Sequence, residues 1–204
     1  MALLKADSAE DRYLVNLVLK GDNSAFTTII RNTERLVTQI VFKLIGNTDD
    51  RKDLAQDIYL RAYKGLPGFT FRAALSTWIA QIAYNTCLNY LEKKKYTLLS
   101  DWEEIADDDT EETDHVLNTI VALADKEVDQ GILQKQRTAI IHQAIETLPP
   151  LYKTLITLYH NEELSYGEIT SITGLPIGTV KNYLFRARKT LKEQLLKQYT
   201  KEEL

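Results

Sequence analysis

The sequence predicts an all-α protein that consists of two small helical domains joined by an acidic, flexible linker. Apolar residues recur at three- and four-residue spacing on both sides of a central segment, which is the period of amphipathic helices. No turn dipeptide separates stretches of alternating apolar and polar residues, so strands are not expected. In the central segment, nine of the fifteen residues from Asp101 to His115 are Asp or Glu, and none is Lys or Arg. Like charges repel and bury no core, so this segment is expected to stay extended.

The apolar spacing divides the chain into helices and connecting segments. Gly and Pro, together with Asp, Asn or Ser caps, mark where helices end and begin. In the N-terminal half we expect a frayed lead-in at residues 1–12, helices at 13–20, 26–44, 50–66 and 77–94, and a loop at 69–76. As domains we expect an N-terminal lead-in (1–21), a first domain (22–96), the linker (97–133, with a short helix around 117–124) and a second domain (134–197).

The second domain is expected to end in two short helices joined by a tight turn, between Leu164 and Leu191. Ser165, followed three residues later by Glu168, is a capping box for the first of them. Gly174 permits a sharp turn, and Pro176 suits the first turn of the next helix, where its missing N–H costs little.

The second of these two helices combines an apolar stripe with a cationic opposite face. From Ile177 to Thr200 the chain has six Lys or Arg and one acid, although the whole chain has a net charge of −4. The stripe consists of Ile177, Val180, Leu184, Ala187 and Leu191. This pattern is typical of a helix-turn-helix whose second helix enters the DNA major groove. The alternative is a surface pair of helices whose basic face is only solvated.

No arrangement of residues indicates catalysis, so an enzyme is not expected, and neither is a cofactor or a metal. The three His residues are far apart, and no Gly-rich phosphate loop is present. Cys87 is interpreted as a core residue, and the acidic residues 107–109 as a solvated run rather than a Mg²⁺ site. We see neither a signal peptide nor a membrane-spanning stretch, and we expect a cytoplasmic protein without membrane insertion or a small-molecule substrate.

The fourth helix carries aromatic, amide and cationic side chains that could stack unpaired bases and hold phosphates. They are Trp78, Tyr84, Asn85, Asn89, Tyr90 and Lys93 to Lys95. The alternative is that Trp78 belongs to the core and that the lysines are a solvated helix end.

Two segments, taken in order, resemble the extracytoplasmic-function (group IV) class of bacterial sigma-70 factors. Residues 53–95 contain DLAQDIY and STWIAQIA, which are similar to the family's region 2 motifs D-L-x-Q-[DE]-x-[FY] and [ST]-T-W-[IL]-x-x-I-A. Residues 145–195 contain LSYGEI and LPIGTVKNYLFRAR, which resemble its region 4. The resemblance therefore implies a promoter-specificity subunit that binds core RNA polymerase, recognises the −35 and −10 promoter elements and helps to open the duplex.

The resemblance also implies roles for individual residues. The docking helix for polymerase corresponds to Asp53, Leu54, Gln56, Asp57 and Tyr59. The −10 contacts correspond to Phe71, Arg72, Trp78, Tyr84, Asn85, Asn89 and Lys93, and the loop that captures a flipped base to residues 69–76. The −35 contacts correspond to Pro176, Gly178, Thr179, Lys181, Asn182, Arg186, Arg188 and Lys189. The chain departs from the family at Tyr84, Asn89 and Glu92, where members often carry Arg, Asp and Arg, so no base preference at −10 is implied.

The expected partners are core RNA polymerase, promoter DNA and, by the resemblance, an anti-sigma factor. Two other readings stay open from residues alone. A helix-turn-helix regulator that recruits polymerase from outside would need a receiver or ligand domain in residues 1–130, which the pattern does not indicate. A helical adaptor that sequesters a partner would have no promoter-dependent effect on transcription.

Overall fold

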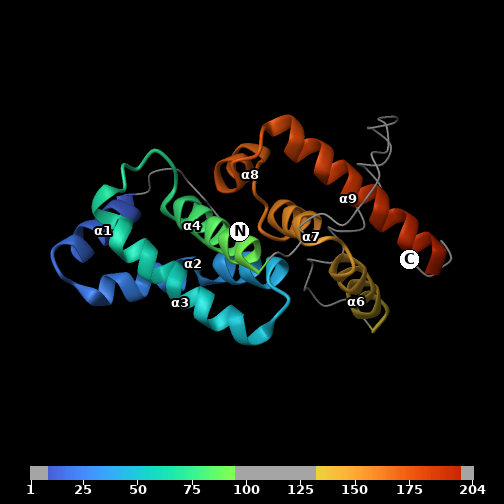
Figure 1. Ribbon diagram of the computed structural model, residues 1–204, viewed down its shortest axis with the longest axis horizontal. Coiled ribbons are helices and arrows are strands. Elements are labelled where there is room, and N and C mark those ends of the chain that lie inside the picture. Colours follow the sequence, from blue (N-terminus) through green and yellow to red (C-terminus); the bar gives the residue numbers. More distant parts are fainter. Residues whose placement is uncertain (1–8, 95–131, 199–204) are drawn as a thin grey trace. The chain divides into compact units, whose positions relative to one another are not determined.

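Every regular element is helical in the residues that the computed structural model describes, which are 9–94 and 132–198 (Figure 1). This confirms the all-α expectation for those residues. They fall into two compact units: residues 9–94 with 167–175, and residues 132–166 with 176–198. The linker and its short helix lie outside the described residues, and the domain boundaries expected from the sequence stay predictions.

The first unit is built around α2. Its helices are α1 (Ala9–Leu19), α2 (Asn23–Leu44), α3 (Thr48–Gly65) and α4 (Leu75–Lys93), with a 3₁₀ turn, η1 (Leu66–Gly68), after α3. The α2 helix packs against α1, α3 and α4 (Figure 1). Its apolar residues recur along one side, and those buried include Ile29, Leu36, Val37, Ile40 and Val41. The amphipathic pattern therefore places α2 at the centre of this core.

The start of α2 is set by Asp22. Its carboxylate accepts hydrogen bonds from the backbone N–H groups of Ser24 (2.8 Å) and Ala25 (3.4 Å), which have no partner within the helix. The hydrogen bonds from Ser24 hold the pKa of Asp22 below its ordinary value. The cap expected from the Asp-Asn-Ser sequence is confirmed.

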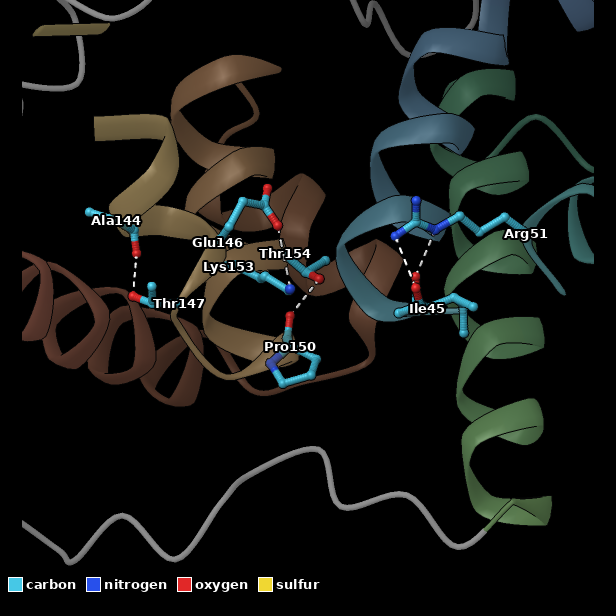
Figure 2. Close-up of polar contacts among 9 residues, drawn as sticks. Ile45, Arg51, Ala144, Glu146, Thr147, Pro150, Lys153 and Thr154 are labelled. Atoms are coloured by element: carbon cyan, nitrogen blue, oxygen red, sulfur yellow. Dashed lines mark hydrogen bonds and ion pairs between the residues drawn. The ribbon is translucent and has the colours of Figure 1, made fainter. Parts of the chain in front are cut away.

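The corner between α2 and α3 is held by Arg51. Its Nε donates to the carbonyl of Ile45 at 2.8 Å, as Figure 2 shows, and its Nη2 donates to that of Gly46 at 3.4 Å. These carbonyls follow the end of α2, where the helix itself supplies no donors. The guanidinium also lies over the ring of Phe42, 4.4 Å from its centroid. One side chain thus joins the end of α2 to the beginning of α3.

The beginning of α3 and the end of α4 are joined by a second cluster, which consists of Asp50, Tyr90 and Lys94. Tyr90 donates its hydroxyl proton to the carboxylate of Asp50, and Lys94 Nζ lies 3.1 Å from the same oxygen. The hydrogen bond from Tyr90, and then Lys94, lower the pKa of Asp50. Tyr90, one of the aromatic residues considered for base stacking, thus ties the end of α4 to the first turn of α3 through its hydroxyl.

The four helices of the first unit all begin two to four residues earlier than expected, and the largest difference is at α1. Helix α1 begins at Ala9, and Leu14, Val15 and Val18 are buried where α1 packs against α2. The prediction of a frayed segment up to residue 12 is therefore wrong for residues 9–12. Helix α4 begins at Leu75 rather than Thr77, because Leu75 is itself a core residue at 2% exposure.

The second unit contains α6 (Ile132–Glu146), α7 (Pro150–Ile156), a π-helical turn, η2 (Thr157–Asn161), and α9 (Ile177–Gln198). Helix α9 packs against α6 and α7. Between η2 and α9 the chain forms α8 (Tyr166–Thr173). Residues 167–175, which include most of α8, belong to the first unit. Helix α8 begins directly after Ser165, as the capping residues predict, and Gly174 follows it with a φ of +73°.

The connection from α6 to α7 is satisfied by short-range polar contacts, which Figure 2 shows. Thr147 donates its hydroxyl proton to the carbonyl of Ala144 at 2.7 Å. Thr154 donates to the carbonyl of Pro150 at 2.7 Å, and Lys153 lies 3.5 Å from Glu146. Pro150 occupies the first turn of α7, where proline suits the helix. The proline pair therefore ends one helix and begins the next.

Candidate polymerase and nucleic-acid interfaces

An exposed polar stripe runs along α3. Asp53 and Gln56 are exposed, and the Asp57 side chain, 41% exposed, forms an ion pair with Arg61 one turn later at 2.8 Å. Positions 53, 56 and 57 share one face because they are three and four residues apart. The stripe thus presents carboxylate and amide groups to solvent, as a polar docking surface requires.

Two other residues assigned to this docking surface face inward. Leu54 is 9% exposed and packs into the core of α1–α4. Tyr59 is half-buried, and its hydroxyl lies 3.2 Å from Thr33 Oγ1 on α2, while burial raises the pKa of its phenol. Leu54 therefore leaves little surface for a partner, whereas the assignment of the partly exposed Tyr59 stays a prediction.

An aromatic cluster occupies the loop between η1 and α4. The ring of Phe69 lies 4.6 Å from that of Phe71 and 4.9 Å from that of Trp78, centroid to centroid. All three side chains are only partly buried, so the cluster borders solvent. A Cβ added at Gly65 would lie 3.1 Å from the Trp78 ring, so the indole approaches the end of α3 closely and a side chain there would have to displace it slightly. Arg72 is exposed beside the cluster.

The adjoining helix α4 has one polar, exposed face. Asn85, Asn89 and Lys93 are all exposed and follow one another at four-residue spacing, so they lie along one line on the helix. Tyr84 does not join them. It is 2% exposed, so its assignment to the −10 contacts is wrong: its position on α4 falls on the buried side with Ala80, Ala83 and Cys87.

Cys87 is a core residue, as expected. It is fully buried, and burial raises the pKa of its thiol to about 12. A thiol in this environment stays protonated and is a poor nucleophile.

Helix α9 presents the cationic face that the sequence predicts. Its stripe of Val180, Leu184, Ala187 and Leu191 is buried, whereas Ile177, assigned to the same stripe, is 52% exposed in the first turn. On the other side Lys181 is exposed, and Asn182, Arg186 and Lys189 are partly exposed. At the start of the helix Pro176 and Gly178 are exposed and Thr179 is partly exposed. The structure therefore leaves seven of the eight predicted −35 residues within reach of solvent.

The eighth residue, Arg188, is buried at 2% exposure. Its Nε donates to Nε2 of His160 at 3.4 Å, and its guanidinium lies over the ring of Tyr159, 5.0 Å from the centroid. Burial, and then the charge of Arg188, lower the pKa of His160 to about 4, so the imidazole is neutral and can accept this proton. The assignment of Arg188 to the DNA backbone is wrong, because it fastens α9 to the π-helical turn instead.

The π-helical turn also contacts α9 through a column of rings and cations. Tyr159 stacks on Tyr166 with centroids 5.0 Å apart and planes within 11°. Lys181 Nζ lies 5.8 Å from the centroid of Tyr166. Tyr159 and His160 could not be recognised from the sequence, because a π-helical turn has no spacing signal of its own.

In residues 9–94 and 132–198, no group of three or more His, Cys, Asp or Glu side chains could hold a metal ion. No helix in this part of the chain is long and apolar enough to cross a membrane. The surfaces of α3, α4 and α9 consist of exposed or partly exposed amides, carboxylates and cations, with a group of rings in the loop before α4.

Comparison with known proteins gives a consistent assignment. The family model described as "Sigma-70 region 2" matches residues 29–97, and the one described as "Sigma-70, region 4" matches residues 138–191. The ECF RNA polymerase sigma factor SigW of Bacillus subtilis is 31% identical over 182 residues, which cover 89% of this chain and 94% of the relative. The chain belongs to the sigma-70 family of RNA polymerase sigma factors. This sigma factor is therefore a promoter-specificity subunit of RNA polymerase, and sigma factors as a family are not enzymes.

Other relatives agree with this assignment. The ECF RNA polymerase sigma-E factor of Escherichia coli K12 is 30% identical to this sigma factor over 186 residues, 91% of this chain and 94% of the relative. The RNA polymerase sigma-H factor of Pseudomonas aeruginosa is 29% identical over 186 residues, with the same coverage. The sigma factor thus resembles ECF members of the family over nearly its whole length.

Two solved structures share the fold. CnrH in complex with the cytosolic domain of CnrY matches with a TM-score of 0.58 at 17% identity, over 93% of this chain and 99% of that one. RpoE of Bartonella quintana, in complex with the anti-sigma factor NepR, matches with a TM-score of 0.56 at 20% identity, over 84% and 96% of the two chains. At these identities the likeness concerns the fold alone.

Proposed function

We propose that this sigma factor binds core RNA polymerase through the exposed stripe of α3 and recognises the −10 and −35 promoter elements with separate domains. The observation that carries the proposal is the match to both region 2 and region 4 in one chain, on either side of an acidic segment. The first domain would span residues 22–96, extended by α1, and the second residues 134–197. The docking residues are Asp53, Gln56 and Asp57, which are polar and accessible on one face of a rigid helix.

At the −10 element, the aromatic loop and the exposed face of α4 bind unpaired bases. Extruding a base from the duplex costs a few kcal/mol, which stacking and a pocket recover. The partly exposed rings of Phe69, Phe71 and Trp78 supply the stacking surface. Asn85 and Asn89 supply both donors and acceptors for base edges. Arg72 and Lys93 lie at the two ends of this surface in the sequence and attract the phosphates.

At the −35 element, α9 reads the duplex from the major groove. Gly178 and Thr179 present the backbone N–H groups of its first turn to a phosphate. Lys181, Asn182 and Arg186 are the side chains that reach base edges or phosphates, and Lys189 holds the backbone. Phosphate contacts set the register, while base contacts give the sequence preference.

The linker joins two weak DNA contacts into one stronger interaction, because holding one element raises the effective concentration of the other. Its acids also compete with phosphates in the free protein. Replacing the carboxylates between Asp101 and Asp114 by amides should therefore strengthen DNA binding by the free protein at fixed salt. No change would remove this role for the charges.

The sigma factor acts in the cytoplasm by binding rather than catalysis, with no cofactor or small-molecule substrate. Its activity is held in check by an anti-sigma factor. Support comes from the two complexes that share its fold, one of them named as a complex with an anti-sigma factor.

The proposal is tested by in vitro transcription with core polymerase over a library of genomic fragments. The sigma factor should start transcripts at sites that core polymerase alone does not use. If the added protein starts no new transcripts, the proposed function fails.

Two substitutions separate the two interfaces. Arg186→Ala should weaken use of the −35 element while binding to core polymerase stays intact. Asp57→Ala should weaken binding to core polymerase, with an unchanged preference among promoters in the complexes that still form. A preference shifted by Asp57→Ala would contradict the division of roles.

A further inference from the structure

Arg12, in the first helix of the chain, lies over a ring of the aromatic loop. Its guanidinium carbon is 4.7 Å from the centroid of Phe71. This is within the range of a cation–π contact. The side chain of Arg12 is exposed, so the contact lies at the solvent border of the aromatic cluster. None of the matched family segments includes Arg12, because the region 2 match begins at residue 29.

Phe71 needs support from outside the loop. Its φ is +57°, a left-handed conformation that bulky residues rarely adopt without surrounding contacts. Its ring also lies against that of Phe69, which in turn contacts Trp78. The left-handed backbone of Phe71 is the conformation in which its ring lies in this cluster. A contact that favours the left-handed form therefore favours the assembled stacking surface.

Helix α1 is placed to give that support. It packs against α2 and against η1, the turn that leads directly into the loop. On the other side of the loop, the close approach of Trp78 to Gly65 ties the start of α4 to the end of α3. The loop is thus held between two rigid supports, and Arg12 is the group from α1 that reaches its strained residue.

We propose that Arg12 is a positioning residue for the −10 site, which holds Phe71 in the left-handed conformation and so preforms the aromatic surface for an unpaired base. The inference rests on the proposed function for its consequence in promoter opening, but not for its effect on the loop itself. The cation is the active feature, so Arg12→Lys should retain the effect and Arg12→Met, of similar length, should lose it. Arg31→Met, an exposed arginine on α2, is the matched control.

The effect on the loop is measured by amide hydrogen exchange in the free full-length protein. The Phe69 amide donates to the carbonyl of Leu66 at 3.1 Å and reports on loop opening. Arg12→Met should raise its exchange rate about two- to fivefold, the factor that an exposed cation–π contact corresponds to. Amides in the middle of α4 should keep their rates. Equal acceleration of all amides, or no change at Phe69, would overturn the inference.

The consequence is measured in the holoenzyme with permanganate reactivity of unpaired thymines, at a promoter found in the transcription experiment. Arg12→Met should lower the open fraction about two- to fivefold, with Arg12→Lys and Arg31→Met near the wild type and binding to a −35 duplex unchanged. In a Phe71→Leu background, Arg12→Met should have no further effect, because the two residues act together. Additive effects would contradict the inference.

These results distinguish the two levels of the argument. If the wild-type holoenzyme opens no promoter, the proposed function fails, while the exchange experiment still decides whether Arg12 positions the loop. If the wild type opens promoters and Arg12→Met opens them equally well, the inference fails and the proposed function stands.

Discussion

Helices α4 and α9 are both amphipathic, but their exposed faces differ in chemistry. The face of α4 carries two amides and one cation, Lys93, beside an aromatic loop. The face of α9 carries three cations, Lys181, Arg186 and Lys189, of which Lys181 lies near the ring of Tyr166. Amides and rings suit unpaired bases, whereas a row of cations suits the phosphates of a duplex. This difference supports the proposal that the two helices bind different states of DNA.

Each helix also buries one residue that the sequence places outside. Tyr84 on α4 and Arg188 on α9 are both 2% exposed. Resemblance to a family does not reveal this burial, because it matches residues by their order in the sequence and not by the direction of their side chains. Substitutions in each helix can test this difference by separating effects on stability from effects on DNA binding.

The largest effect is expected for Tyr84→Ala on α4. Removing a buried ring leaves a cavity and should lower the free energy of unfolding by about 3–5 kcal/mol. Urea unfolding of the full chain measures this. The neighbouring Asn85→Ala, which changes an exposed side chain, should stay within about 0.5 kcal/mol. Equal stabilities would mean that Tyr84 is not a core residue.

The next effect concerns pH and His160, which supports α9. The folded-state pKa of His160 is about 4, below its ordinary value of 6.5, so below pH 6.5 the unfolded chain binds a proton that the folded chain does not. Stability from this group is therefore full above pH 6.5 and falls as the pH drops towards 4, by up to about 3 kcal/mol. The difference in free energy of unfolding between the wild type and His160→Gln should change over this window. A constant difference would contradict the neutral, buried imidazole.

Arg188 and Arg186 offer a matched pair on α9. Arg188→Ala should lower the free energy of unfolding by about 2 kcal/mol, since it removes a charged hydrogen bond and buried packing. Arg186→Ala should leave stability nearly unchanged and reduce the salt dependence of −35 duplex binding by about one unit of slope if Arg186 contacts a phosphate. Urea unfolding and holoenzyme binding across a salt series measure the two effects. A loss of stability in Arg186→Ala would reverse the assignment.

The smallest effect is expected for Asn89→Ala on the exposed face of α4. The loss of one or two hydrogen bonds to bases should weaken promoter opening by about 1 kcal/mol and leave stability unchanged. Permanganate reactivity and urea unfolding of the same variant measure the two. If Asn89→Ala instead weakened binding to a −35 duplex, Asn89 would not act at the −10 element.

The helices, their approximate ends and the family could be predicted from the sequence alone. Apolar spacing and caps such as Asp22 act locally, so they can be recognised without knowing what the helix packs against. The same is true of the polar line Asn85, Asn89 and Lys93, and of the cationic face of α9. These predictions depend only on helical period, which a sequence displays directly.

Only the tertiary structure decided which side chains on those helices remain available. Tyr84 and Tyr59 have polar groups and lie at positions that the resemblance assigns to interfaces, yet packing against neighbouring helices buries or engages them. Arg188 is charged, but the π-helical turn brings His160 and Tyr159 to it from 28 and 29 residues away in the sequence. Arg12 reaches Phe71 across an even longer separation. Such contacts arise from how elements pack together, and no local pattern encodes them.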